Sequence, residues 1–137
     1  CLHTLRAVVP SMVENRFGKI VTVSSVNGAF GVAKETSYAV AKCAVVQLTR
    51  SLATELRPFG INVNCLMPGP VATDRFLSTL KGRNDHDLKD IHSTERLQRV
   101  GKPDDLSPVV EFLIGSGSDF ISGEVIRVDG GLFNHPM

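Results

Sequence analysis

The sequence predicts an α/β fold in which three short strands alternate with helices and pair in parallel. Three short runs are rich in apolar or β-branched residues, as strands buried in a sheet are. A segment with the signals of a helix precedes each run. The resulting order requires crossover connections, which place parallel strands in one sheet with helices on its faces.

The first helix and strand lie within the first 25 residues. Apolar side chains recur at helical steps over residues 2–13, where Pro10 is compatible with a kink or an early end. A β-branched run at residues 20–23 predicts a strand that ends in Ser24 and Ser25.

The clearest helix covers residues 37–57. Thr36 or Ser37 can cap its start. The apolar stripe that predicts the helix consists of positions 41, 44, 45, 48, 52 and 56. Residues 61–66 then predict a second strand, which Pro68-Gly69-Pro70 stops.

The last helix and strand follow a long polar segment. Residues 73–100 carry charges of both signs and no strong strand signal. A helix over 103–114 is predicted because proline is favoured at the first helical position, and Asp104 and Asp105 complement the positive end of the helix dipole. Residues 124–128 predict the third strand.

Composition and charge exclude several functional classes. Apolar residues make up 42% and charged residues 21% of the 137 residues, which is typical of a globular domain or a piece of one. The net charge of +1 provides no excess that would drive binding to nucleic acid or an anionic membrane. No apolar run approaches the roughly 18 residues of a membrane span.

The three cysteines form no C-x-x-C pair, which favours a reducing, cytoplasmic location and argues against a structural zinc site. Cys43 is expected to be a small thiol in the core; the alternative is a thiol made reactive by the nearby charge of Lys42. The segment 84–92 holds two histidines and several aspartates, but the spacing of His86 and His92 does not place them on one helical face. We therefore predict no metal site and interpret this segment as a solvated lid.

Tyr38 and Lys42 carry the strongest chemical signal. They are four residues apart near the start of a helix and therefore share one face. An ammonium held near a phenol lowers the pKa of the phenol from its usual value of about 10. Ser25, thirteen residues earlier at the end of a strand, offers a second hydroxyl for the same substrate oxygen. Such a set suits proton transfer to a carbonyl oxygen while a hydride reaches its carbon.

A surface tyrosine beside a solvated lysine is the simpler interpretation of an isolated Y-x-x-x-K, because such pairs are common by chance. The surrounding sequence makes the pair specific. The chain resembles the classical short-chain dehydrogenase/reductase family, and is most similar to members such as 3-oxoacyl-carrier-protein reductases. Five stretches carry the resemblance in the family's order: residues 18–25, 37–42, 61–74, 101–106 and 122–131.

The resemblance implies a role for each matching position. Ser25 would hold the substrate oxygen, with Ser24 as the rival for this role. Tyr38 would be the general acid or base, and Lys42 would bind the nicotinamide ribose of NAD or NADP. Four further residues would line the nicotinamide: Pro68, Gly69, Val71 and Thr73. The partners implied are a small alcohol or carbonyl substrate and further copies of the chain in a homodimer or homotetramer.

The resemblance also implies that the chain is the C-terminal half of a Rossmann-type doubly wound parallel sheet. The whole of 1–137 would then be one partial domain, and the first residue is Cys1 rather than Met. No Gly-rich phosphate-binding turn follows any predicted strand. We therefore expect 1–137 alone to be inactive.

Two other functions stay open. The chain can be a truncated, non-catalytic remnant that acts by oligomerising with full-length relatives. It can also belong to a dehydratase or epimerase that reuses Tyr38 and Lys42 without net nicotinamide turnover.

Overall fold

The computed structural model describes residues 1–31, 33–79, 97 and 99–132. Four α-helices and three strands are found in these ranges: α1 (Leu2–Asn15), β1 (Gly18–Val23), α2 (Thr36–Leu56), β2 (Ile61–Pro68), α3 (Asp74–Thr79), α5 (Pro103–Ile114) and β3 (Val125–Val128). Three single turns of 3-10 helix connect them: η1 (Val26–Gly28), η2 (Arg57–Phe59) and η4 (Ser116–Ser118).

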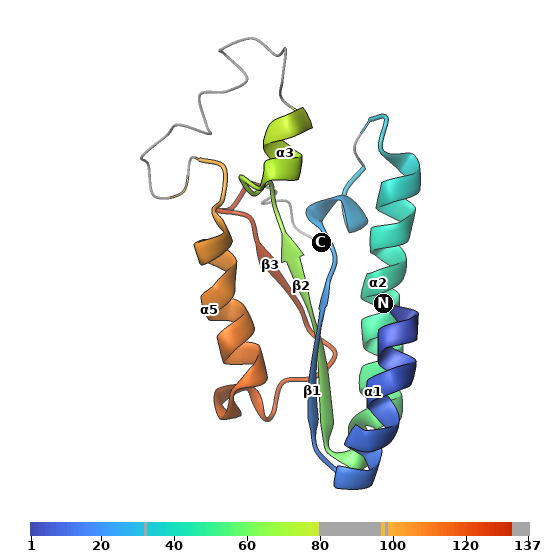
Figure 1. Cartoon of the computed structure of the whole chain (residues 1–137). Helices are drawn as coiled ribbons and strands as arrows, with labels where there is room; N and C mark the ends of the chain where they lie inside the picture. Colours follow the sequence, from blue (N-terminus) through green and yellow to red (C-terminus); the bar gives the residue numbers. More distant parts are fainter. Residues whose placement is uncertain (32, 80–96, 98, 133–137) are drawn as a thin grey trace.

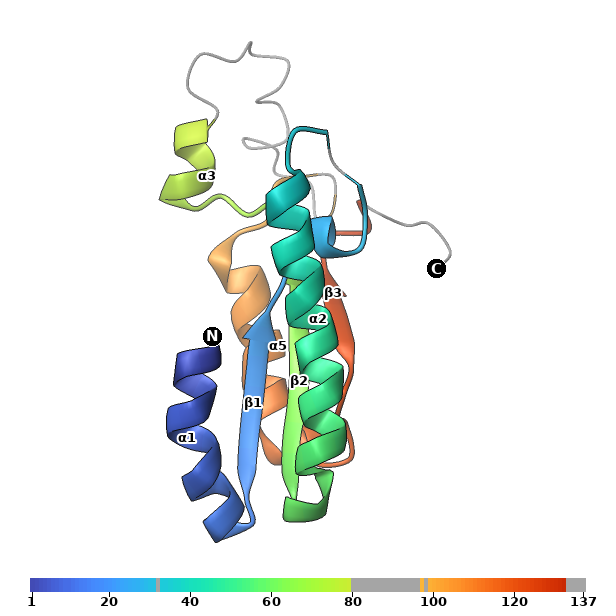
Figure 2. The ribbon, with the colours of Figure 1, turned by 90° about the vertical axis from the view of Figure 1, so that its right-hand side faces the viewer.

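The three strands form one parallel sheet, as the sequence predicts, and their order in the sheet is β1-β2-β3. Val23 pairs with Leu66 across the first interface, and Pro68 pairs with Val128 across the second. Helices α1 and α2 cover one face of the sheet and α5 covers the other (Figure 1). In the view turned by 90°, α2 crosses in front of the strands and α5 lies behind them (Figure 2).

The core follows from the alternation of side chains along β2. Ile61, Val63 and Cys65 are at most 2% exposed and belong to apolar clusters with residues of α1, β1 and α2. Such burial is the main source of folding free energy. Two asparagines alternate with them: the Asn62 amide donates to the Asp119 carbonyl over 2.9 Å, and the Asn64 amide donates to the Ile121 carbonyl over 2.9 Å. These bonds hold the turn that leads into β3.

The buried face of α2 differs from the predicted stripe. Its buried residues are Val46, Thr49, Ala53 and Leu56, whereas Ala41 and Ala44 are exposed. The polar Thr49 is tolerated inside because its hydroxyl shares a 2.6 Å hydrogen bond with the hydroxyl of Thr22 on β1.

Two element boundaries also differ. Glu35, not Thr36 or Ser37, is the N-cap of α2, and no side chain caps the helix there. The Asn27 amide donates to the Glu35 carboxylate, so a contact with the loop after β1 holds the residue at which the helix begins. Pro10 lies inside α1 without ending it, and the short helix α3 forms in a segment that the sequence left unassigned. Of the helices in the described ranges, none has the length and apolar character that a membrane span needs.

Candidate active site

The residues singled out by the sequence gather at the C-terminal ends of the strands. Ser25 follows β1 and Pro68 ends β2. The start of α2 and the short helix α3 lie at the same end of the sheet (Figure 1). In open parallel sheets, ligands bind beyond these strand ends.

Tyr38 and Lys42 lie in successive turns at the start of α2. The Lys42 ammonium is 5.7 Å from the centre of the Tyr38 ring, and the tyrosine is 37% exposed. The same ammonium donates a 3.0 Å hydrogen bond to the backbone carbonyl of Val23, the last residue of β1. Lys42 is therefore held at the strand end, two residues before Ser25.

The two serines after β1 have different surroundings. Ser24 is 3% exposed, and its hydroxyl donates to the Lys42 backbone carbonyl over 2.7 Å. Ser25 is only partly buried, and its hydroxyl accepts a hydrogen bond from the Asn27 backbone N–H over 3.3 Å. That bond leaves the hydroxyl proton of Ser25 for another acceptor. No hydrogen bond joins Ser25 to Tyr38 in the described part of the chain.

Gly28 brings the loop after β1 against α2. A Cβ atom on Gly28 would lie 2.8 Å from the backbone carbon of Lys42 and 2.8 Å from the Ser24 hydroxyl oxygen. The close approach therefore requires glycine. Sequence reasoning placed Gly28 only in a loop, because nothing in the sequence marks the helix backbone that it meets.

The four residues expected to line a cofactor follow β2. The Gly69 backbone N–H donates to the Val128 carbonyl over 3.0 Å, and a Cβ atom on Gly69 would lie 2.7 Å from the Cβ of Asp129. Val71 forms an isolated parallel bridge with Gly101. The Thr73 hydroxyl accepts a 3.3 Å hydrogen bond from the Phe76 backbone N–H at the start of α3.

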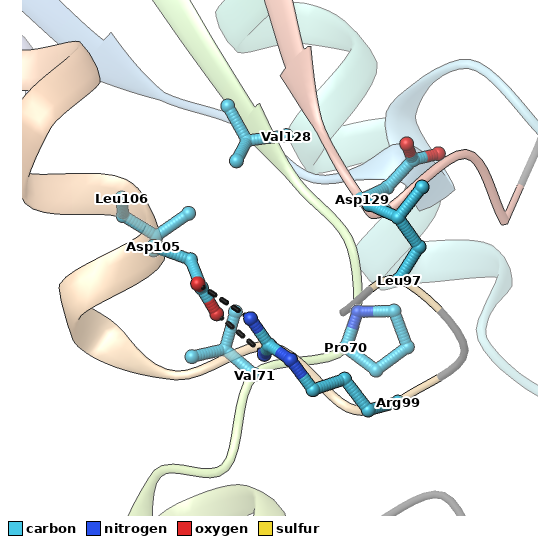
Figure 3. Close-up of a pocket in the computed structure, with 10 residues that line it drawn as sticks. Pro70, Val71, Leu97, Arg99, Asp105, Leu106, Val128 and Asp129 are labelled. Carbon is cyan, nitrogen blue, oxygen red and sulfur yellow. Dashed lines mark hydrogen bonds and ion pairs between the residues drawn. The ribbon is translucent and has the colours of Figure 1, made fainter. Parts of the chain in front are cut away.

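A cavity of about 290 Å³ lies beside this segment (Figure 3). Val71 lines this cavity, whereas Ser25, Tyr38 and Lys42 do not. Its charged lining includes Arg99 and Asp105, whose side chains form two parallel hydrogen bonds of 2.7 Å each. Paired groups in this fork geometry are among the stronger polar interactions in proteins.

The hydrogen bonds from Arg99, followed by one from the Lys102 backbone N–H, lower the pKa of Asp105 to about 2. Because the folded-state pKa lies below the unfolded one, the pair stabilises the fold above the ordinary carboxyl pKa, and this contribution is lost as the pH falls through about 2. We expect the Asp105 side-chain carbon to titrate near pH 2 by NMR and to return toward about 4 in Arg99→Ala. An unchanged titration midpoint of Asp105 in Arg99→Ala would contradict Arg99 as the main cause of the lowered pKa.

One further sequence prediction, for Cys43, is contradicted, and another, for the segment 84–92, stays a prediction. Cys43 is exposed, so its prediction as a core thiol is wrong: it lies on the outer face of α2 with Gln47 and Arg50. The segment 84–92 lies outside the described residues. Within the ranges that the structure does describe, no three His, Cys, Asp or Glu side chains cluster as metal ligands would.

Comparisons with known proteins cover nearly the whole chain. Residues 1–133 match a family profile described as Enoyl-(Acyl carrier protein) reductase. The chain is 41% identical over 138 residues to a cyclohexanol dehydrogenase of Rhodococcus sp. (strain TK6), which covers 96% of this chain and 48% of that protein. It is 35% identical over 126 residues to the 3-oxoacyl-[acyl-carrier-protein] reductase FabG of Chlamydia trachomatis. That match covers 92% of this chain and 49% of the other protein.

Solved structures agree with this similarity. A gluconate 5-dehydrogenase from Burkholderia cenocepacia J2315, in complex with NADP and tartrate, superposes with a TM-score of 0.85 at 29% identity. That match covers 96% of this chain and 51% of the other. The chain spans about half the length of the curated relatives it matches.

Proposed function

This chain belongs to the short-chain dehydrogenase/reductase family, and on that basis we propose that Ser25, Tyr38 and Lys42 form the proton-transfer site of an NAD(P)-dependent oxidoreductase. The substrate is a small secondary alcohol or ketone. The observation that carries the proposal is the position of the Lys42 ammonium. It lies 5.7 Å from the Tyr38 ring centre and donates a hydrogen bond to the Val23 carbonyl at the end of β1.

Each of the three side chains has one task. The Tyr38 hydroxyl donates its proton to the carbonyl oxygen in reduction and accepts it back in oxidation. The Lys42 ammonium stabilises the negative charge that develops on the phenol oxygen as this proton leaves. The Ser25 hydroxyl donates a hydrogen bond to the substrate oxygen, keeps its proton, and so orients the carbonyl. Ser24 is less suited to this role, because its hydroxyl already bonds the Lys42 carbonyl.

The donor groups of this chain fit the nicotinamide end of a dinucleotide. Lys42 offers an ammonium to the ribose hydroxyls, and Pro68, Gly69, Val71 and Thr73 follow the neighbouring strand end. When bound, NADH or NADPH would supply the hydride for reduction, and NAD⁺ or NADP⁺ would accept it in oxidation. Val71 contributes backbone groups for the carboxamide, and Thr73 contributes its hydroxyl. That hydroxyl accepts from the Phe76 backbone N–H, so its own proton stays available to donate. The Gly-rich turn for the pyrophosphate has no counterpart in this sequence.

We further propose that residues 1–137 are the C-terminal half of a larger Rossmann-type domain and are inactive alone. In the described sheet β1 pairs only with β2, so its other edge presents unpaired backbone groups to a further strand. Phe17, directly before β1, and Val23, its last residue, are 66% and 51% exposed. The full-length protein is proposed to be a cytoplasmic homodimer or homotetramer that binds neither nucleic acid nor membrane.

A panel of small alcohols and ketones tests the proposed function, assayed with both NADH and NADPH on the full-length protein. We expect nicotinamide oxidation or reduction with at least one substrate pair. With residues 1–137 alone we expect no turnover and weak or no dinucleotide binding. Conversion of substrate without net nicotinamide turnover would identify the dehydratase or epimerase alternative. Measurable NADH oxidation by 1–137 would refute the partial-domain proposal.

A further inference from the structure

We propose that Arg99 is a positioning residue that acts through Asp105 and Gly101 to hold Val71 in place at the nicotinamide end of the site. This inference rests on the proposed function for the role of Val71. The positioning itself follows from contacts of the described residues and is testable without any activity.

The segment that contains Val71 leaves the sheet after β2 and depends on Gly101 for its position. The Gly101 backbone N–H donates to the Pro70 carbonyl over 2.9 Å, and the Ala72 backbone N–H donates to the Gly101 carbonyl over 2.8 Å. These two bonds enclose Val71 in its isolated bridge. A displacement of Gly101 therefore displaces the backbone groups of Val71.

Gly101 is in turn held from both sides by Asp105. On one side Arg99 makes its two 2.7 Å bonds to the carboxylate and a third bond, of 3.0 Å, to the Val100 carbonyl. On the other side the Lys102 backbone N–H donates to the same carboxylate over 2.6 Å. The chain on each side of Gly101 thus converges on one carboxylate. Figure 3 shows the two bonds from Arg99.

Asp105 connects this arrangement to the body of the fold. It lies in the first turn of α5, and the last turns of that helix bury Leu113 to 1% exposure. The fit at the bridge is also tight, since a Cβ atom on Gly101 would lie 3.2 Å from the Pro70 carbonyl oxygen. The ion pair is only partly exposed, with side-chain exposures of 19% for Arg99 and 34% for Asp105.

The test compares Arg99→Ala, Arg99→Lys and the control Lys102→Ala in the full-length protein. Lys102→Ala removes a neighbouring positive charge but keeps the backbone N–H that Asp105 accepts from. We expect Arg99→Ala to raise amide hydrogen exchange of Ala72 and Gly101 about tenfold and to leave Cys65, in the centre of β2, unchanged. Arg99→Lys keeps the positive charge and is expected to restore part of the protection. The restoration is incomplete because lysine lacks the planar fork that makes two parallel bonds.

Kinetics separate positioning from general loss of stability. Uniform binding contributes to KM and not to kcat, so Arg99→Ala is expected to raise KM for the dinucleotide about tenfold with kcat changed less than about threefold. Unchanged exchange at Ala72 and Gly101 overturns the positioning role, and equal acceleration throughout the sheet does the same. Faster local exchange with an unchanged KM overturns the connection between Val71 and the cofactor.

Failure of the proposed function can be told apart from failure of the positioning role, even if the full-length protein proves inactive. The proposed function then fails, whereas the exchange measurement still decides whether Arg99 holds the bridge. If Arg99→Ala does not fold, Asp105→Asn gives the same exchange comparison, because it removes the charge that Arg99 pairs with and keeps the size of the side chain.

Discussion

Replacement of Tyr38 by phenylalanine is expected to abolish turnover by the full-length protein while the fold is preserved. The ring that faces Lys42 stays, and only the hydroxyl that moves the proton is lost. Removal of a general acid–base group typically costs about 10²–10⁴ in rate. The measurement is kcat/KM in both reaction directions, with circular dichroism and thermal unfolding on the same samples.

Ser24→Ala is the matched control for this experiment. It removes the hydroxyl bonded to the Lys42 carbonyl, so we expect it to lower the free energy of unfolding by about 1 kcal/mol with a much smaller effect on rate than Tyr38→Phe. Ser25→Ala is expected to lower the rate more than Ser24→Ala does, and to lower the free energy of unfolding by up to about 1 kcal/mol, because it also removes the bond accepted from the Asn27 backbone N–H. Retention of most turnover by Tyr38→Phe would remove the basis of the proposed mechanism.

Gly28→Ala is expected to be the second most damaging change, because it forces the loop after β1 away from α2. The added methyl would lie 2.8 Å from the Lys42 backbone carbon and 3.0 Å from the Cys43 backbone nitrogen. Backbone atoms of a helix cannot rotate aside as a side chain can. We expect a loss of about 1–3 kcal/mol in the free energy of unfolding, measured with urea, and a further loss of activity because Ser25 shifts relative to Lys42.

Gly31→Ala provides the control in the same loop. No heavy atom lies within 4 Å of a Cβ atom built on Gly31, so the change in unfolding free energy is expected to stay within about 0.5 kcal/mol. Equal effects of the two substitutions would show that the loop does not depend on the close contact at Gly28.

The comparison of α2 with its predicted form shows where sequence reasoning succeeds and where it stops. The helix was predicted over 37–57 and runs over Thr36–Leu56, because a long periodic segment determines a helix locally. Its buried face was predicted less well, since Thr49 is polar and becomes buried only by pairing with Thr22 on another element. The start at Glu35 likewise depends on a contact with Asn27.

The candidate site also has features that the sequence predicted and features that only the structure shows. Tyr38 and Lys42 were found from the sequence because their four-residue spacing already places them on one helical face. The different surroundings of Ser24 and Ser25 became visible only in the structure, because the acceptor of the Ser24 hydroxyl is a backbone carbonyl eighteen residues away. The Arg99–Asp105 pair was missed because an arginine and an aspartate six residues apart carry no signal in a charged segment.

The sequence by itself determined the alternation of the three strands with α1, α2 and α5, the parallel sheet that this alternation requires, and the helical face shared by Tyr38 and Lys42, because these depend on periodicity and spacing within single segments. Only the tertiary structure decided the bond from Lys42 to the end of β1, the approach of Gly28 to α2, and the bridge between Val71 and Gly101. Each of these joins atoms distant along the chain, and their separation is set by how the layers pack rather than by any local preference.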